Sequence, residues 1–175
     1  MAGEIVEVTW RAPDDIIAMT HGGEIPMQII PPGIQSLAGT GIDQQLVMVV
    51  KVRDAQDRVV GMMTEIEIFS PGDRFEVYST LVLPGRGALA SYQTKSRSTL
   101  MKPFAEVLAG AETWSGELDI VMSKGPLADG RGRLIAATGE FDGCTGFHQQ
   151  SITFTAISAT GSVGVTRERF ELVRG

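Results

Sequence analysis

His148 and Gln150 are the side chains whose type and spacing best suit chemistry on a small molecule. From residue 147 onward the odd positions are polar, whereas the even positions carry His148, Gln150, Ile152 and Phe154. Side chains alternate faces along a strand, so the two polar groups lie at one end of a mostly apolar face. An apolar interior with a few convergent polar groups is typical of a small-molecule pocket. Either side chain could donate a hydrogen bond to a substrate carbonyl as charge develops on it.

Other interpretations of these residues stay open. His148 is explained equally well as an ordinary hydrogen-bonded residue near a strand end. Gln150 is harder to explain in that way, because burying an amide without a partner is costly. Tyr78 or Tyr92 would supply a third donor, although the sequence does not fix which face of their strands points inward.

A pocket of this kind needs apolar walls around its polar groups. Methionine suits such walls, because its flexible and polarisable side chain adapts to an irregular ligand. The expected wall residues are Met48, Met62, Ile66, Met122, Ile152 and Phe154. The methionines among them would serve equally well in a plain hydrophobic core.

Metal and thiol chemistry are both disfavoured. The chain has two histidines, His21 and His148, and a site built on two histidines and a carboxylate would need both. Cys144, the single cysteine, has no basic neighbour close in sequence that would favour a thiolate. We therefore expect no metal site and no catalytic thiolate.

The carboxylates have the pattern of solvated residues. Glu65 and Glu67 occupy the more polar face of the predicted strand 59–69. The Arg-Glu-Arg run at 167–169 is typical of an exposed strand face. None of these residues is expected in the site.

Length and charge restrict the class of protein. With 175 residues, the chain has the length of one domain. Its net charge of −6 argues against a nucleic-acid partner, since phosphate binding needs clustered Lys and Arg. It has no apolar run of about 18 residues, so we expect no membrane span. The N-terminus lacks the pattern of a signal peptide, and a lone cysteine suits a reducing compartment, so we expect a cytoplasmic protein.

Several segments have the composition and alternation of strands, separated by turn signals about every 8–12 residues. They are 4–10, 45–52, 59–69, 74–83, 88–95, 117–123, 131–138, 147–157 and 162–172. This spacing favours an all-β protein. We predict a single antiparallel β-barrel of about eight strands, with one short helix and an irregular N-terminal stretch.

Two segments interrupt the strand pattern. Residues 13–41 are rich in proline and glycine, so we expect 1–44 to be a strand followed by an irregular capping segment. Residues 98–113 predict a helix, with Ser98 as its cap and apolar residues at spacings of three and four. The predicted domain spans 1–175, with the barrel in 45–175 and a helical insertion near 98–113.

Two glycine-containing runs resemble a known superfamily. They are Leu118-Asp-Ile-Val-Met-Ser-Lys-Gly-Pro126 and Leu134-Ile-Ala-Ala-Thr-Gly-Glu-Phe-Asp-Gly-Cys-Thr-Gly146. A strand that ends in a Thr-Gly turn, followed by a short step into the next strand, resembles the allene oxide cyclase barrels, which include the dirigent proteins. Segment 138–150 looks closest to the bacterial [4+2] cyclases of tetronate and spirotetronate polyketide pathways. This chain has His148 and Gln150 where those cyclases carry an arginine and a tryptophan, which puts their particular substrate in doubt.

The resemblance implies catalysis by the shape of a barrel lumen. We expect a cofactor-independent cyclase of bacterial secondary metabolism that closes a ring, by an intramolecular [4+2] or related reaction, in a linear apolar polyketide-type intermediate. A non-catalytic, lipocalin-like barrel that carries a hydrophobic metabolite shares every one of these sequence features. The resemblance also implies a homo-oligomer.

Overall fold

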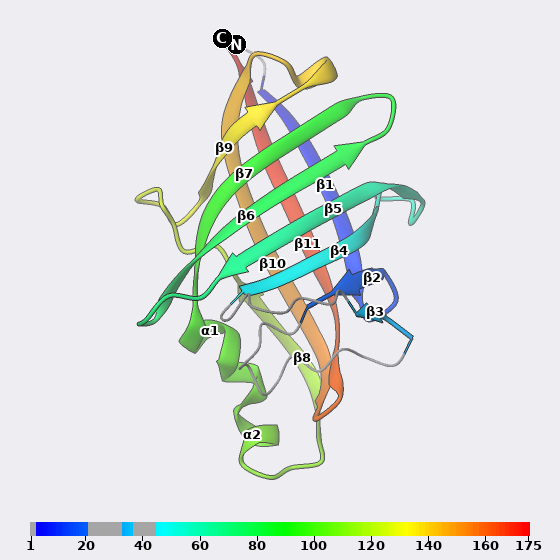
Figure 1. The fold of residues 1–175 in the computed structure, drawn as a ribbon, viewed down its shortest axis with the longest axis vertical. Helices are drawn as coiled ribbons and strands as arrows, with labels where there is room; N and C mark the ends of the chain where they lie inside the picture. Colours follow the sequence, from blue (N-terminus) through cyan, green and yellow to red (C-terminus); the bar gives the residue numbers. More distant parts are fainter. Residues whose placement is uncertain (1–2, 21–32, 37–44) are drawn as a thin grey trace.

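The computed structural model describes residues 3–20, 33–36 and 45–175 (Figure 1). Much of the expected capping segment, including His21, lies outside the described residues. In the described part of the chain, no helix is long and apolar enough to cross a membrane.

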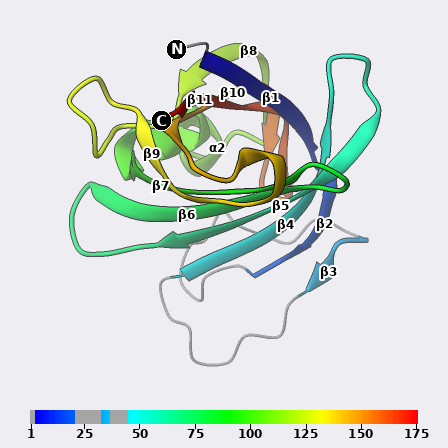
Figure 2. The same cartoon turned by 90° about the horizontal axis from the view of Figure 1, so that it is seen from above.

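Eight strands form a closed antiparallel barrel, as the alternation and turn signals predict. The hydrogen-bonded order is β1-β11-β10-β9-β7-β6-β5-β4, and β4 returns to β1 through the pair Thr9 and Arg53. Seen along the long axis in Figure 2, β1, β10 and β11 lie opposite β4 to β7. The barrel strands are β1 (Gly3–Ala12), β4 (Gln45–Arg53), β5 (Val59–Ile68), β6 (Arg74–Leu83), β7 (Gly87–Ser96), β9 (Gly132–Ala137), β10 (Cys144–Ser158) and β11 (Gly161–Arg174).

In the described part of the chain, three further strands lie outside this closed path. β8 (Thr113–Val121) pairs with the second half of β10, beyond the point where β9 pairs with it. β2 (Ile16–Met19) pairs with β4, and the two-residue β3 (Gln35–Ser36) pairs with β2. The expectation that 13–41 is irregular is therefore wrong for β2 and β3. Both strands are too short to show an alternating pattern of their own, and each forms by pairing with a neighbour.

The predicted helix is present only as short helical turns after β7. They are α1 (Arg97–Met101), the 3₁₀ turn η1 (Lys102–Phe104) and α2 (Ala105–Leu108). The cap is Ser96 rather than Ser98, because the Ser96 side chain accepts a hydrogen bond from the Thr99 N–H at 3.2 Å. Pro103 has no backbone N–H to continue the helical ladder, which explains the break. A second 3₁₀ turn, η2 (Gly139–Phe141), precedes β10.

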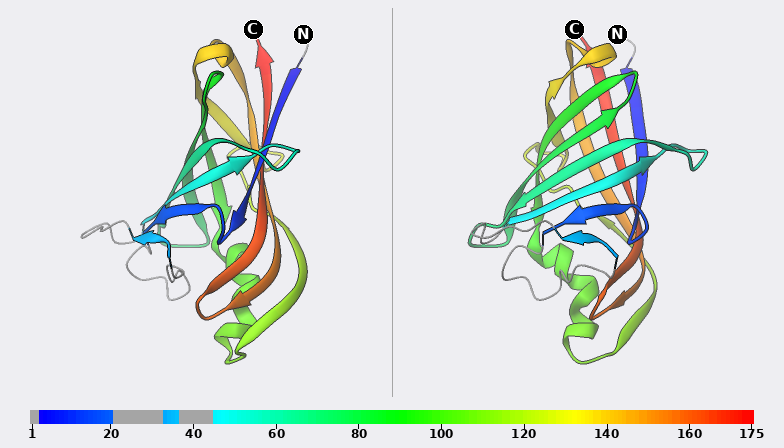
Figure 3. Two further views of the ribbon diagram at one scale, coloured as in Figure 1. Left: turned by 90° about the vertical axis from the view of Figure 1, so that its right-hand side faces the viewer. Right: turned by 45° about the vertical axis from the view of Figure 1, so that its right-hand side comes forward.

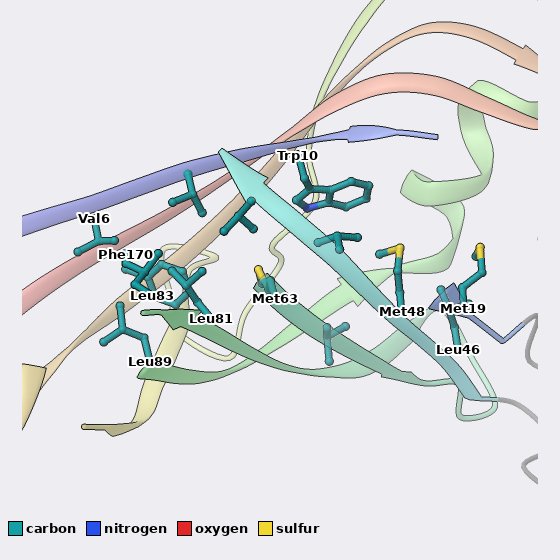
Figure 4. Close-up of a cluster of buried hydrophobic side chains, with 14 of the residues drawn as sticks. Val6, Trp10, Met19, Leu46, Met48, Met63, Leu81, Leu83, Leu89 and Phe170 are labelled. Atoms are coloured by element: carbon teal, nitrogen blue, oxygen red, sulfur yellow. The ribbon is translucent and has the colours of Figure 1, made fainter. Parts of the chain in front are cut away.

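The barrel interior changes in character along its axis. Both chain ends lie at one end of the molecule, and α1 and α2 lie at the other (Figures 1 and 3). Toward the chain ends the interior is apolar, with Val6, Leu83, Leu89 and Phe170 packed together, while Met48 lies at the opposite end of the same cluster (Figure 4). Between these ends, inward positions of β5, β7, β10 and β11 carry buried polar residues.

The predicted inner face of β5 is reversed in the structure. Met62 and Ile66 were expected in the pocket wall, but they lie on the outer face and are 51% and 37% exposed. Met63, Glu65 and Glu67 point inward and are buried. The outward face is the more apolar one in sequence, and the glutamates are nevertheless buried because another strand supplies them with Lys95 as a partner inside the barrel.

Candidate active site

A cavity of about 140 Å³ occupies the end of the barrel near α1 and η1. Its wall is mostly apolar and includes Trp10, Ala12, Ile16, Met19, Leu46, Met48, Leu100, Phe104, Met122, Ile152 and Phe154. The polar side chains in the wall are Glu65, Glu67, Lys95, Gln150, Ser162 and Thr166. Since an engineered cavity of ~150 Å³ binds benzene, this space holds one ring-sized group.

Lys95 lies between two buried carboxylates in the cavity wall. Its Nζ donates to Glu65 Oε1 at 2.6 Å and to Glu67 Oε1 at 2.7 Å. The glutamates are two residues apart on β5 and therefore share the inward face, and β7 brings the lysine to them. Leu46 and Val77, which pair with Glu67 in the strand register, are apolar. Glu67 thus depends on Lys95 for its charge compensation.

This arrangement sets the protonation of the cluster. Burial raises the pKa of Glu67 to about 7, with Lys95 opposing the rise and the charge of Glu65 adding to it. For Lys95, burial acts to lower the pKa, but the two carboxylates outweigh it and raise the pKa above its ordinary value. The lysine therefore stays charged, whereas Glu67 exchanges a proton near neutral pH.

Gln150 connects this cluster to a second buried carboxylate. Its Nε2 donates to Glu65 Oε2 at 2.8 Å and to Glu168 Oε1 at 2.7 Å. Ionised carboxylates only accept hydrogen bonds, so the amide nitrogen must face them. Both N–H groups are therefore engaged, and the amide oxygen is the atom left free. Gln150 lines the cavity as an acceptor, not as the donor that the sequence predicted.

Glu168 is fully buried at the centre of the polar interior. It accepts hydrogen bonds from Trp10 Nε1 at 3.0 Å and from Gln150, and His148 Nε2 lies 2.9 Å from its second oxygen. Burial acts to raise the pKa of Glu168, but the contacts with His148, Gln150 and Trp10 together lower it. The expectation of an exposed face at 167–169 is wrong for this residue, because alternation along β11 turns its two arginine neighbours outward.

Ser91, His148 and Glu168 have the connectivity of a serine-hydrolase triad. Ser91 Oγ lies 2.8 Å from His148 Nδ1, and the other ring nitrogen contacts Glu168. Neither Ser91 nor His148 lines the cavity, however, and the His148 ring stacks on Phe170 with ring centroids 4.2 Å apart. We therefore interpret the hydrogen-bonded series Ser91, His148 and Glu168 as a positioning network. It orients Glu168, which in turn orients Gln150.

Four buried polar atoms have no hydrogen-bond partner within the described ranges. They are Glu67 Oε2, Gln93 Nε2, Gln150 Oε1 and Thr166 Oγ1. All except Gln93 belong to residues that line the cavity. A buried polar atom without a partner costs about 1–3 kcal/mol, so these three atoms are the ones a bound molecule would satisfy.

The structure brings part of the predicted site together. Gln150, Met48, Met122, Ile152 and Phe154 all line the cavity, as expected from their positions in the sequence. Their roles toward a ligand stay predictions.

The other predicted residues lie elsewhere. His148 is inside the barrel but behind the cavity wall. Tyr78 and Tyr92 lie on the outer face, with their rings 5.1 Å apart and both hydroxyls near Glu76. Their strands place Ser79 and other alternate residues inward, so neither tyrosine is a donor to the cavity.

Sequence reasoning missed Glu65, Glu67, Lys95 and Glu168. A signal for Lys95 was present, because Leu89, Ser91, Gln93 and Lys95 share one face of β7 and change from apolar to polar along it. The glutamates gave no such signal. Among the residues that the structure describes, no three or more His, Cys, Asp or Glu side chains are grouped to hold a metal ion.

Comparison with known proteins gives a likeness of fold. No protein-family model and no curated sequence matches the chain. The structure of the pterocarpan synthase dirigent protein PsPTS1 is similar with a TM-score of 0.54 and 10% identity, over 99% of this chain and 96% of that one. The pterocarpan synthase dirigent protein GePTS1 gives a TM-score of 0.52 and 12% identity, over 99% and 92% of the two chains.

These neighbours confirm the predicted dirigent-type barrel at the level of the fold. The closer likeness to bacterial polyketide cyclases has no support in them. At 10% and 12% identity, the comparison carries over no residue role.

Proposed function

We propose that this protein is a cyclase or isomerase for a small, mostly apolar molecule, which it holds in the barrel cavity and with which Glu67 exchanges a proton. The observation that carries the proposal is the free Oε2 of Glu67, which belongs to a buried side chain in the wall of an apolar cavity. The neighbours of the same fold are named pterocarpan synthases, which agrees with a small-molecule substrate.

The cavity wall would supply the first part of the catalysis. A flexible chain loses conformational freedom when it is enclosed, and holding its reacting atoms together removes several kcal/mol, about 7 or more in favourable cases, from the barrier. A volume of about 140 Å³ suits the part of the substrate that becomes one ring. Met19, Met48 and Met122 give this wall an adaptable surface.

Glu67 would supply the second part. A general acid or base works best with a pKa near the operating pH, and that of Glu67 is about 7. Lys95 holds the other oxygen of this carboxyl at 2.7 Å and so fixes its orientation. These side chains provide acid–base chemistry by themselves, so the proposed reaction is independent of a cofactor. Within this proposal, the finer assignment is an intramolecular [4+2] or related ring closure in a polyketide-type chain of bacterial secondary metabolism. A [4+2] step itself moves no proton, so Glu67 would exchange its proton with the substrate in forming the reactive isomer before the ring closes.

The proposal is tested with extracts of the organism that encodes the chain, after deletion of the gene. Ring closure by isomerisation leaves the mass unchanged, so we expect wild-type protein to convert one accumulated compound into an isomer of different retention in liquid chromatography with mass detection. Glu67→Gln should slow this conversion at least about 100-fold, because general acid–base catalysis contributes about 10²–10⁴. Glu76→Gln, on the outer face of β6, is the matched control and should convert at the wild-type rate.

Two results would count against the proposal. If Glu67→Gln converts the compound at the wild-type rate, Glu67 is not the proton-exchanging group. If native mass spectrometry finds the compound bound to wild-type protein and always returned unchanged, the protein is a lipocalin-like carrier instead.

A further inference from the structure

Three of the unpartnered buried atoms share a chemical character. Gln150 Oε1 can only accept a hydrogen bond, because the amide nitrogen is held by two carboxylates. Glu67 Oε2 accepts when the carboxyl is ionised, and Thr166 Oγ1 can accept as well as donate. All three side chains are buried and line the same cavity. Each of them would be satisfied by a hydrogen-bond donor that a ligand brings into this cavity.

The polar interior also carries more negative than positive charge. Among the residues that the structure describes, three buried carboxylates in this interior, Glu65, Glu67 and Glu168, face one lysine and one histidine, Lys95 and His148. Even with the histidine protonated, three ionised carboxylates leave one negative charge without a counter-charge. A buried charge of this kind is costly unless it is paired. A proton on Glu67 removes it, and so would a positive charge brought by a ligand.

We propose that the cavity takes an apolar molecule that carries an amine, bound as its ammonium ion against Glu67 Oε2. The inference rests on the proposed function in one respect, namely that this cavity is the substrate site, and the proton that Glu67 exchanges is then one of those on the bound ammonium. A primary ammonium has three donors, which matches Glu67 Oε2, Gln150 Oε1 and Thr166 Oγ1. Its apolar body would contact the methionine and aromatic side chains of the wall.

Other polar head groups fit less well. A carboxylate or phosphate would be repelled by the carboxylates and would offer no donor to the three free acceptors. A hydroxyl donates one hydrogen bond and brings no charge. Lys95 does not already fill the role of the cation, because its ammonium is held by the Oε1 atoms of both glutamates and leaves Glu67 Oε2 free.

The test compares three probes that share one ring and differ in head group: benzylamine, benzyl alcohol and toluene. A ring of this size suits a cavity of about 140 Å³. The chain has two tryptophans, Trp10 and Trp114, and Trp10 lines the cavity. In a Trp114→Phe background, the fluorescence of Trp10 therefore reports binding, and calorimetry gives the affinities independently.

We expect benzylamine to bind at least about tenfold more tightly than benzyl alcohol at about pH 8, because charge-assisted hydrogen bonds are the stronger ones. The preference should shrink toward about pH 6, as Glu67 takes up its proton. The other titratable groups near Glu67 are Glu65, Lys95, His148 and Glu168, so the pH series is repeated in Glu67→Gln. Loss of the pH dependence in that variant assigns it to Glu67.

Two variants and one control separate the contacts. Glu67→Gln should remove most of the preference for benzylamine over benzyl alcohol, and the outer-face Glu76→Gln should keep it. Thr166→Val preserves the side-chain shape and replaces the hydroxyl with a methyl group. It should weaken the binding of benzylamine by about threefold or more and leave the affinity for toluene unchanged. This second variant keeps the test informative if Glu67→Gln does not fold.

The outcomes distinguish this inference from the proposed function. If benzyl alcohol and toluene bind as tightly as benzylamine, the amine inference is wrong while the cavity stands as a small-molecule site. If none of the three probes changes Trp10 fluorescence or gives binding heat, both the inference and the proposed site fail. An equal preference for benzylamine in wild type, Glu67→Gln and Thr166→Val would also overturn the inference.

Discussion

Replacing Glu67 with glutamine should stabilise the protein above neutral pH, although the change removes a buried ion-pair partner. Burial raises the pKa of this carboxyl from its ordinary value of 4.5 to about 7. At about 1.36 kcal/mol for each pH unit, the difference corresponds to about 3 kcal/mol of folding free energy. Glutamine resembles the protonated carboxyl in shape and charge, so it avoids this cost.

The direction in which stability changes with pH follows from which state, folded or unfolded, holds the proton on Glu67. Below about pH 4.5, the folded and unfolded states both hold the proton on Glu67, and the residue contributes no pH dependence. Between about pH 4.5 and 7 only the folded state holds it, so wild-type stability falls as the pH rises. Above about pH 7 both states have lost the proton, and the full cost remains. The gain from Glu67→Gln should therefore appear across this window and reach about 3 kcal/mol at pH 8.

The assay is urea unfolding of wild type, Glu67→Gln and the outer-face control Glu76→Gln at several pH values. Thermal unfolding of the same proteins gives a second measurement. For a chain of this length, a stability difference of about 3 kcal/mol corresponds to a shift of roughly 6–12 °C in Tm. Glu168 and Asp15, whose pKa values are lowered, make wild type lose stability as the pH falls through their folded-state pKa values. Both residues are present in all three proteins, so their contributions to the pH dependence of stability cancel in the comparison. A Glu67→Gln variant less stable than wild type at pH 8 would show that the ionised Glu67 side chain does not destabilise the folded state.

Two further perturbations test the interior and the turn geometry. Lys95→Met should destabilise the fold by about 3–5 kcal/mol in chemical denaturation, because it leaves two buried carboxylates without their cation. The control Lys102→Met, at an exposed position, should change stability by about 0.5 kcal/mol or less. Gly87→Ala should cost more stability than Gly85→Ala: both have positive φ, but a Cβ at 87 would overlap the Thr138 carbonyl, while one at 85 meets open space. Equal losses within either pair would contradict these assignments.

The barrel could be predicted because its long strands carry their own signals. β4, β6 and β11 show strict alternation between buried and less buried positions over much of their length, and turns bound them. β2 and β3 could not be predicted, since their pairing with β4 and with each other, not their composition, forms them. The helix predicted over 98–113 is present as three short turns that end at Leu108, because Pro103 interrupts the backbone hydrogen bonds of a regular helix.

The residues of the candidate site could be predicted only where the alternation along a single strand places them on its inward face. Gln150, Ile152 and Phe154 follow from alternation along β10. The glutamates of β5 do not, since Glu65 is 85 residues from Gln150 and 30 from Lys95, and nothing local shows that these side chains meet. A glutamate that pairs with a lysine inside the barrel cannot be distinguished, from the sequence of its own strand, from a glutamate that faces water.

We propose that Glu67 carries an exchangeable proton near neutral pH in the cavity wall. The most direct test is a ¹³C NMR titration of protein labelled at the glutamate side-chain carboxyl carbons, with Glu67→Gln identifying the Glu67 resonance by its loss. We expect a midpoint at about pH 7 for this resonance. A midpoint near the ordinary value of 4.5 would contradict it, because Glu67 would then be fully ionised at neutral pH and unable to hold the proton that the proposed chemistry requires.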